Sequence, residues 1–211
     1  MNEARPAFGD FPKDFRGSVL RPGDPGFVES RRIFNMKFAE DTPALIARAA
    51  DEDDVARLMR YAYERGAPVA IRSGGHSSDG SSMPHGALVL DMTAMKRLSV
   101  DAGRAVCRAE SGILLGELDV ATQQHGLVVP AGTVSTTGIA GLTLGGGVGF
   151  NMRRFGATVD NLLGCDVVTA DGRKVREHHA DRPSEHRPGA KAGQDQHGGD
   201  DDGRLRQRCR A

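Results

Sequence analysis

Two glycine-rich segments about sixty residues apart constrain the fold of this chain more than any other feature. The first follows an apolar run and reads SGGHS at residues 73–77, and the second reads GIAGLTLGGGVG at residues 138–149. Glycine supplies 28 of the 211 residues, which is about 13% against a usual share of roughly 7%. Because the excess is concentrated in these loops, each segment has to be explained by what its backbone does there.

The two segments supply candidate donors for an anionic ligand. Successive N–H groups in a glycine-rich turn after a strand form a concave cluster that suits a diphosphate. The candidates are Arg72, Ser73, Gly74, Gly75, His76 and Ser77 in the first segment, and Thr136, Thr137, Gly138, Gly141, Gly145, Gly146, Gly147 and Gly149 around the second. Two such surfaces suit a long ligand with two ends, such as a dinucleotide; ordinary tight packing is the alternative. Arg72 is a candidate phosphate contact; the alternative is that it ends a strand and its side chain lies in solvent.

Several kinds of site are disfavoured. GxxxxGK[ST] does not occur, and GGGVGF fails the GxGxxG pattern, which argues against a P-loop or a Rossmann site. The cysteines at positions 107, 165 and 209 form no CxxC, so we expect neither a disulfide framework nor a metal site.

Charge and hydropathy limit the partners and the location. Lys plus Arg and Asp plus Glu both total 28, so no net field favours nucleic acid or an anionic membrane. The N-terminus has no apolar core of signal-peptide length, and no apolar run is long enough to span a bilayer. These features predict a soluble, cytoplasmic protein.

Hydrophobic periodicity predicts an α+β fold. The first half is predicted to be a β-α-β unit with parallel strands. The unit consists of a strand at 43–49, a helix at 51–64 capped by Asp51, and a strand at 68–71, and a third strand follows at 87–90. The second half starts with a hairpin, whose strands lie at 98–101 and 104–109, followed by a helix at 112–125. After a mostly irregular stretch, GCDVVTADGRKV reads as a strand, an Asp-Gly turn and the start of a partner strand.

The last 36 residues, 176–211, differ in composition from the rest of the chain. They contain one large aliphatic residue, Leu205, and many arginine, glycine, aspartate and histidine residues. Such a segment cannot bury enough apolar area to offset its ordering entropy. We therefore expect a disordered tail beginning at Arg176.

These motifs, in order and spacing, resemble the FAD-binding (PCMH-type) domain of the berberine-bridge-type FAD-linked oxidases, whose fold is shared with vanillyl-alcohol oxidase. The residues that carry the resemblance are RPGDPGF, RRIFNMKF, PALIARAADEDDVARLM, RSGGH, ESG, GTVSTTGIAGLTLGGGVGFNMRRFGATVDNL and DVVTADG. It implies an FAD-binding domain at 20–175, after an N-terminal extension at 1–19. The implied fold is two-lobed, with a β-α-β lobe and a second lobe built on a mixed or antiparallel sheet.

The resemblance also gives His76 a role. In the family, the histidine of RxGGH attacks the C8 methyl position of the flavin and forms a covalent 8α-histidyl link, and His76 occupies that position. A neutral imidazole is a competent nucleophile at neutral pH. Some relatives add a second link through a cysteine, but the matching residue here is Val134, so a single link is expected.

The implied function is that of an FAD-linked oxidoreductase, which takes a hydride from a small-molecule substrate carbon and passes the electrons to oxygen. In the family, a tryptophan-containing segment and a substrate domain follow DVVTADG, whereas this sequence has no tryptophan and continues into the polar stretch at 176–211. A frameshift or truncation would produce that pattern. No catalytic residue is therefore assigned, and the alternative is an inactive FAD-binding remnant, in which the second sheet ends after Val175 with an unpaired edge. The oligomeric state is left open.

Overall fold

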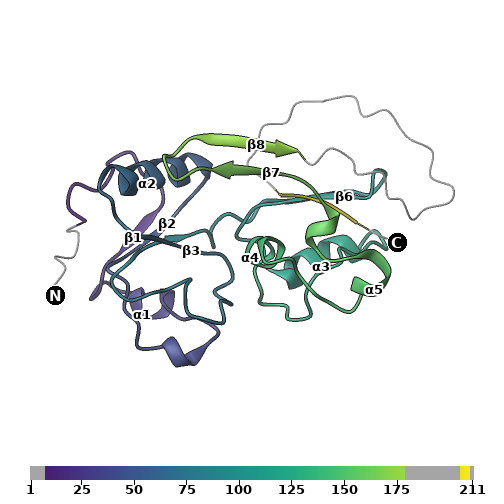
Figure 1. Ribbon diagram of the computed structural model, residues 1–211, viewed down its shortest axis with the longest axis horizontal. Helices are drawn as coiled ribbons and strands as arrows, with labels where there is room; N and C mark the ends of the chain where they lie inside the picture. The colour runs from purple at the N-terminus through teal and green to yellow at the C-terminus, as the bar shows by residue number, and fades with distance from the viewer. Residues whose placement is uncertain (1–7, 179–204, 210–211) are drawn as a thin grey trace.

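The first lobe of the molecule is a mixed sheet of four strands (Figure 1). In the computed structural model, which describes residues 8–178 and 205–209, the strands are β1 (Ser18–Leu20), β2 (Leu45–Arg48), β3 (Val69–Arg72) and β4 (Leu88–Asp91). Strand β1 is antiparallel to β2, while β2 and β3 both run parallel to β4. The parallel β-α-β unit is confirmed, with the additional finding that β4 lies between its two strands.

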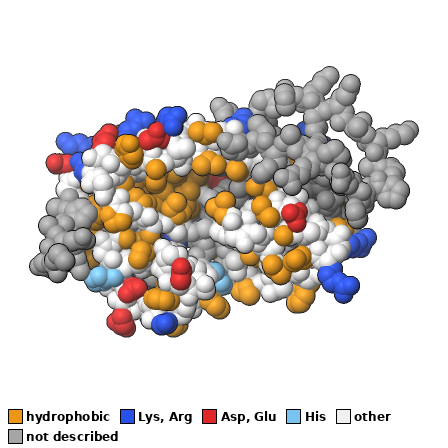
Figure 2. Space-filling view, viewed as in Figure 1, with side chains coloured by type: hydrophobic (Ala, Val, Ile, Leu, Met, Phe, Trp, Pro, Cys, Tyr) orange, Lys and Arg blue, Asp and Glu red, His pale blue; other side chains and the backbone are white. Residues whose placement is uncertain are grey.

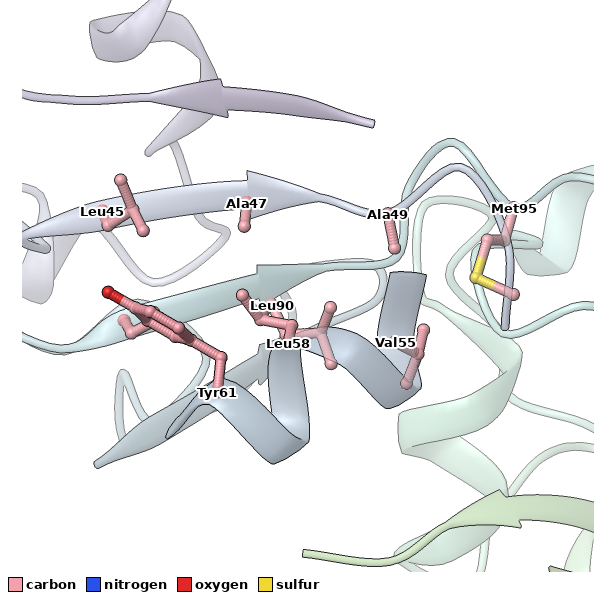
Figure 3. Packing of buried hydrophobic residues seen from close by; sticks show 9 residues of the cluster. Leu45, Ala47, Ala49, Val55, Leu58, Tyr61, Leu90 and Met95 are labelled. Atoms are coloured by element: carbon pink, nitrogen blue, oxygen red, sulfur yellow. The ribbon is translucent and has the colours of Figure 1, made fainter. Parts of the chain in front are cut away.

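Helix α2 (Glu52–Glu64) packs on this sheet. The Asp51 carboxylate accepts hydrogen bonds from the N–H groups of Asp53 and Asp54, which confirms the predicted N-cap. The apolar face of the helix, with Val55, Leu58 and Tyr61, faces the buried side chains of β2 and β4 (Figure 3). The connection from β1 to β2 contains two short elements, α1 (Phe27–Ser30) and η1 (Met36–Phe38).

The second lobe is an antiparallel sheet of five strands, with helix α3 (Leu115–Gln123) packed in the same core. The strands, in the order β5-β6-β9-β7-β8, are β5 (Leu98–Asp101), β6 (Val106–Ala109), β9 (Leu205–Arg208), β7 (Leu162–Val168) and β8 (Lys174–His178). The two-lobed α+β fold is therefore confirmed, and so are both predicted hairpins.

The stretch expected to be mostly irregular contains three short helical elements. These are α4 (Ile139–Leu144), α5 (Met152–Phe155) and η2 (Val159–Asn161). Each spans fewer than two turns, which is too short for a 3.6-residue period to emerge from the sequence. No helix among the described residues has both the length and the apolar content needed to cross a membrane.

Strand β9 corrects the predicted boundary of the tail. Strand β8 runs to His178, and Leu205–Arg208 pair with both β6 and β7 in the middle of the second sheet. Strand β9 therefore fills the space between β6 and β7, whereas β8, which contains Val175, is the edge strand and among the described residues pairs only with β7. A four-residue strand with one aliphatic residue has no detectable hydrophobic period, so the sequence does not predict it. Pairing with a strand on each side satisfies its backbone hydrogen-bonding groups and stabilises it in the sheet. Residues 179–204 and 210–211 of the predicted tail lie outside the described residues.

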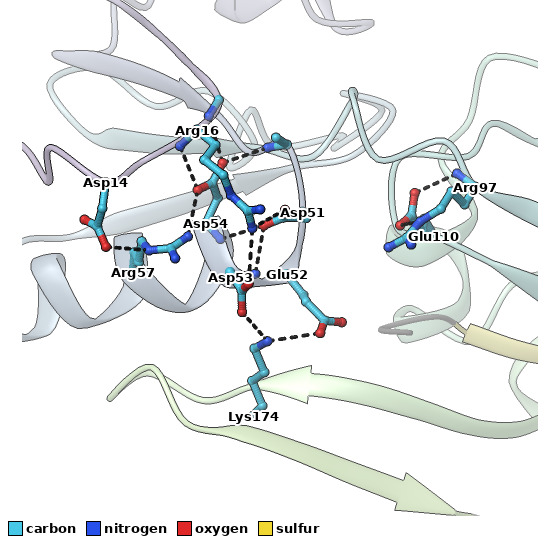
Figure 4. A network of polar contacts seen from close by, with 12 residues as sticks. Asp14, Arg16, Asp51, Glu52, Asp53, Asp54, Arg57, Arg97, Glu110 and Lys174 are labelled. Carbon is cyan, nitrogen blue, oxygen red and sulfur yellow. Dashed lines mark hydrogen bonds and ion pairs between the residues drawn. The ribbon is translucent and has the colours of Figure 1, made fainter. Parts of the chain in front are cut away.

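The hairpin of β7 and β8 connects the two lobes by extending over α2 (Figure 1). Its Lys174 ammonium pairs with Glu52 at 3.0 Å and Asp53 at 2.6 Å on that helix (Figure 4). The hydrogen bond from Lys174 also lowers the pKa of the Asp53 carboxyl. At the hairpin turn, a Cβ on Gly172 would lie 2.6 Å from the carbonyl oxygen of Ala56, so the turn packs directly on the helix. These contacts hold the lobes together.

Candidate functional site

A cavity of about 620 Å³ lies between the lobes, and both glycine-rich segments line it. The first lobe contributes the end of β3 and the loop at 73–82, and the second contributes Ser111 and the start of α4. Apolar side chains of Met59, Ile71 and Met92 form part of the wall, and apolar side chains also gather over the middle of the face seen in Figure 2. A mostly apolar cleft of this size with a few polar groups is typical of a cofactor or small-molecule site.

The loop after β3 offers a run of backbone donors. Residues 74–78 all line the cavity. Within the part of the chain that the structure describes, their N–H groups donate no hydrogen bond to the protein. Gly75 has a φ of +70°, a left-handed conformation that favours glycine. Neighbouring donors without acceptors fit the phosphate oxygens of a dinucleotide, which supports the anion site predicted for this loop.

Gly74 and Gly138 are the places where the two glycine-rich segments touch. A Cβ on Gly74 would lie 2.2 Å from the backbone nitrogen of Gly138, and a Cβ on Gly138 would lie 2.4 Å from that of Gly74. No side chain fits at either position. Ser73, beside this contact, donates its hydroxyl to the carbonyl of Ser111 at 2.5 Å and also lines the cavity. Two segments distant in sequence therefore both need glycine in order to form one wall.

The later glycines of the second segment have a different role. Four of its predicted ligand-binding glycines do not line the cavity, namely Gly145, Gly146, Gly147 and Gly149, and neither do Thr136 and Thr137 just before it. A Cβ on Gly147 would lie 2.2 Å from the Thr158 hydroxyl, and one on Gly149 would lie 1.7 Å from the carbonyl oxygen of Ala131. The first two donate their N–H groups to carbonyls of α4. Close packing, the alternative that the sequence left open, is therefore seen at Gly147 and Gly149, while Gly145 and Gly146 follow α4, with a φ of +97° at Gly146. Gly141 lines the cavity with open space at its Cβ position.

Arg72 does not line the cavity either. Its Nη1 donates to the carbonyl of Ser30, its Nη2 donates to the carbonyl of Arg32 at 3.0 Å, and Nη1 lies 3.5 Å from the buried carboxylate of Asp91. Burial lowers the pKa of the guanidinium, and Asp91 opposes that shift. The two terminal nitrogens of Arg72 thus anchor the segment before β2. Its Nε is buried without a hydrogen-bond partner among the described residues, and the phosphate contact expected for Arg72 stays a prediction.

His76 lies at the cavity with both ring nitrogens beside hydroxyl groups. Nε2 is 2.8 Å from Thr136 Oγ1, and Nδ1 is 3.4 Å from Thr137 Oγ1. The ring of Phe34 stacks on the imidazole with a centroid separation of 4.4 Å and an interplanar angle of 17°. Burial lowers the pKa of His76 below its usual value. This shift favours the neutral imidazole, which keeps one nitrogen lone pair for use as a nucleophile or base.

Sequence reasoning missed two residues of this site. Ser82 is 7% exposed and lines the cavity. Its hydroxyl has no hydrogen-bond partner among the described residues, so a ligand with an acceptor fits there. Phe34 lies in the segment RRIFNMKF. Only its contact with His76 in the folded molecule shows that it belongs to the site. The position of Ser82 in the same loop as His76 is the one signal that the sequence offered.

Residues 43–177 match the family model described as an FAD binding domain. The chain belongs to this family. The FAD-binding domain is 34% identical over 172 residues to (R)-6-hydroxynicotine oxidase of Paenarthrobacter nicotinovorans, a match that covers 82% of this chain and 37% of that relative. It is also 34% identical over 158 residues to an uncharacterised FAD-linked oxidoreductase of Bacillus subtilis, covering 75% of this chain and 35% of that protein.

The fold of the domain is similar to that of a solved oxidase and of a solved BBE-like protein. The match to 6-hydroxy-D-nicotine oxidase from Arthrobacter nicotinovorans has a TM-score of 0.78 at 34% identity, over 82% of this chain and 38% of that one. The match to the BBE-like 1 protein of Physcomitrella patens has a TM-score of 0.74 at 30% identity, and it covers 78% of this chain and 36% of that one. The chain thus spans little more than a third of the length of these relatives. The predicted family, its fold and FAD as the cofactor it binds are confirmed.

Proposed function

We propose that this domain holds FAD covalently through His76 and serves an oxidoreductase that takes a hydride from a carbon of a small-molecule substrate and passes the electrons to oxygen. The observation that carries the proposal is the imidazole of His76 at the cavity, in a loop whose N–H groups at residues 74–78 have no acceptor among the described residues. The relatives support the chemistry, since one of them is named as an oxidase of (R)-6-hydroxynicotine.

Different residues at the cavity would contact different parts of the cofactor. The N–H groups of residues 74–78 and the Ser82 hydroxyl are donors for the pyrophosphate. Gly141 leaves open space at its Cβ position in the opposite wall, so the cofactor can lie close to the backbone there. Thr136 and Thr137 hold the two edges of the imidazole of His76.

The attachment joins one imidazole nitrogen of His76 to the methyl carbon at flavin C8. Two hydrogens are released overall, one from the imidazole N–H and one from a methyl C–H, and dioxygen accepts them as hydrogen peroxide. Once bound, FAD supplies the capacity to accept a hydride. The part of His76 in the attachment is to offer a neutral nitrogen lone pair, which its lowered pKa keeps available at pH 7.

A denaturing gel viewed for flavin fluorescence tests this proposal. The purified protein should show a fluorescent band, because a covalent flavin survives denaturation. The His76→Ala variant should lose the band while still binding FAD reversibly. His125→Ala is the matched control, since His125 is an exposed residue that does not line the cavity. Equal fluorescence in His76→Ala and the parent would refute the assignment of His76 as the attachment site.

A further inference from the structure

We propose that Phe34 is a positioning residue for flavin attachment, holding the imidazole of His76 in the orientation from which it reacts. The proposal rests on the proposed function in one respect, which is that His76 is the point of attachment. It adds a device outside the loop of His76: the segment at residues 30–38, here called the clamp, which carries Phe34 and docks on that loop.

Several contacts join the clamp to the His76 loop. The N–H of Phe34 donates to the carbonyl of Gly75 at 2.9 Å, and the side-chain amide of Asn35 donates to the carbonyl of Ser78 at 2.7 Å. The ring of Phe38 lies against Gly80, where a Cβ would fall 2.5 Å from the ring. The clamp is therefore held on both sides of His76 by backbone and side-chain contacts.

Arg72 holds the start of the clamp. Its guanidinium donates to the carbonyls of Ser30 and Arg32 and lies beside the buried carboxylate of Asp91. Because Arg72 ends β3 and Asp91 ends β4, the clamp is fixed to the rigid sheet of the first lobe. Phe34 thus occupies a defined place relative to the loop that follows β3.

The placement of Phe34 is not explained by burial in the core. Its side chain is 65% exposed, although phenylalanine contributes most to stability when it is buried. Within the described part of the chain, its one aromatic contact is the near-parallel stack on His76. The hydroxyls of Thr136 and Thr137 hold the edges of the imidazole, but two edge contacts leave its tilt free, and the stack fixes that tilt. Orientation of this kind speeds a reaction by keeping the reacting groups aligned.

The same stack shields one face of the imidazole from water. Burial is what lowers the pKa of His76. The charged residues on the elements packed around it are Asp79 in its own loop, Arg32 and Lys37 on the clamp, Arg72 on β3 and Asp91 on β4, and all of them are kept in the variants below. Removing the Phe34 ring exposes the imidazole, so the pKa of His76 rises toward its usual value. Attachment needs the neutral imidazole, so its pH midpoint moves upward.

The first test measures attachment over time in the apo-protein mixed with FAD, across a pH series. Phe34→Ala should attach flavin at least about tenfold more slowly than the parent at saturating FAD, with a higher pH midpoint. Phe34→Tyr should restore both, because it keeps the ring. Val28→Ala is the matched control, since Val28 is 62% exposed and lies just before the clamp. A Phe34→Ala variant with the parent's rate and pH midpoint would overturn the proposal.

The second test needs no flavin and so separates this inference from the proposed function. The proton resonance of the His76 ring, assigned by its loss in His76→Ala, is titrated by NMR in the apo-protein. It should titrate at higher pH in Phe34→Ala than in the parent and in Phe34→Tyr. An unchanged titration would refute the role of Phe34 even if His76 carries the flavin. If no protein attaches flavin, the proposed function fails and this titration still decides the shielding of His76.

Discussion

At the scale of single residues, glycines that look alike in the sequence perform different tasks. Gly74 and Gly138 let two backbones meet, Gly141 leaves space in the cavity wall, and Gly147 and Gly149 pack against neighbouring groups of the second lobe. The sequence predicts that glycine is needed in both segments. It cannot predict which glycine faces a ligand, because that depends on distances between backbones that meet only after folding.

Gly149 is expected to be needed for stability. A Cβ there would lie 1.7 Å from the carbonyl oxygen of Ala131, so the backbone has to shift. Gly149→Ala should lower the free energy of unfolding by about 1–3 kcal/mol, measured by urea denaturation. In Gly9→Ala the new Cβ meets nothing within 4 Å, so that control should stay within about 0.5 kcal/mol of the parent. Equal stability of the two variants would contradict the packing role.

Gly141 is expected to matter for the cofactor and not for the fold. It lies in α4 and lines the cavity, and a Cβ there meets no other atom within 4 Å. Gly141→Ala should keep the melting temperature of the parent. Its methyl group takes up space against the cofactor, so FAD should bind about tenfold more weakly, which is about 1.4 kcal/mol. A fluorescence titration of the apo-protein measures this, and unchanged affinity would remove Gly141 from the site.

At the scale of elements, strong local signals predict well and short elements do not. Helix α2 could be predicted because it is 13 residues long, has Asp51 as a cap and keeps one apolar face. Helix α4 has six residues, and β9 has four in a polar stretch. Their positions depend on tertiary partners. Gln207 in β9, for example, is buried and donates its amide to the Thr143 hydroxyl of α4 at 3.2 Å.

Gln207 provides a test of β9. Its Oε1 is buried without a partner among the described residues, and the Thr143 hydroxyl still donates to Ile139 without it. Gln207→Leu should therefore change the free energy of unfolding by no more than about 1 kcal/mol. Gln207→Lys buries an unpaired charge and should destabilise the sheet by several kcal/mol, with faster hydrogen exchange in β6 and β7. If both variants behave like the parent, β9 does not occupy the middle of the sheet.

At the scale of the whole molecule, the motifs predict the family and the two lobes, and the structure adds how the lobes form one site. The first lobe supplies the loop of His76 and the clamp, and the second supplies Thr136, Thr137 and the wall at Gly138. The hairpin of β7 and β8 fixes the lobes relative to each other, because Lys174 of β8 pairs with Glu52 and Asp53 of α2. The order of motifs in a sequence cannot reveal that Phe34, far from the glycine-rich segments, reaches the imidazole, because that contact exists only once the clamp has docked.

The central claim, a flavin held between the lobes on His76, is tested most directly by peptide mass spectrometry. Trypsin cleaves after Arg72 and Lys96, and the peptide between them contains His76 and also His85 as an internal control. After reconstitution with FAD and full denaturation, this peptide should carry the mass of the flavin, and fragmentation should locate it on His76. A protein that binds FAD reversibly but yields only the unmodified peptide, or one that carries the flavin on any other residue, would contradict the account.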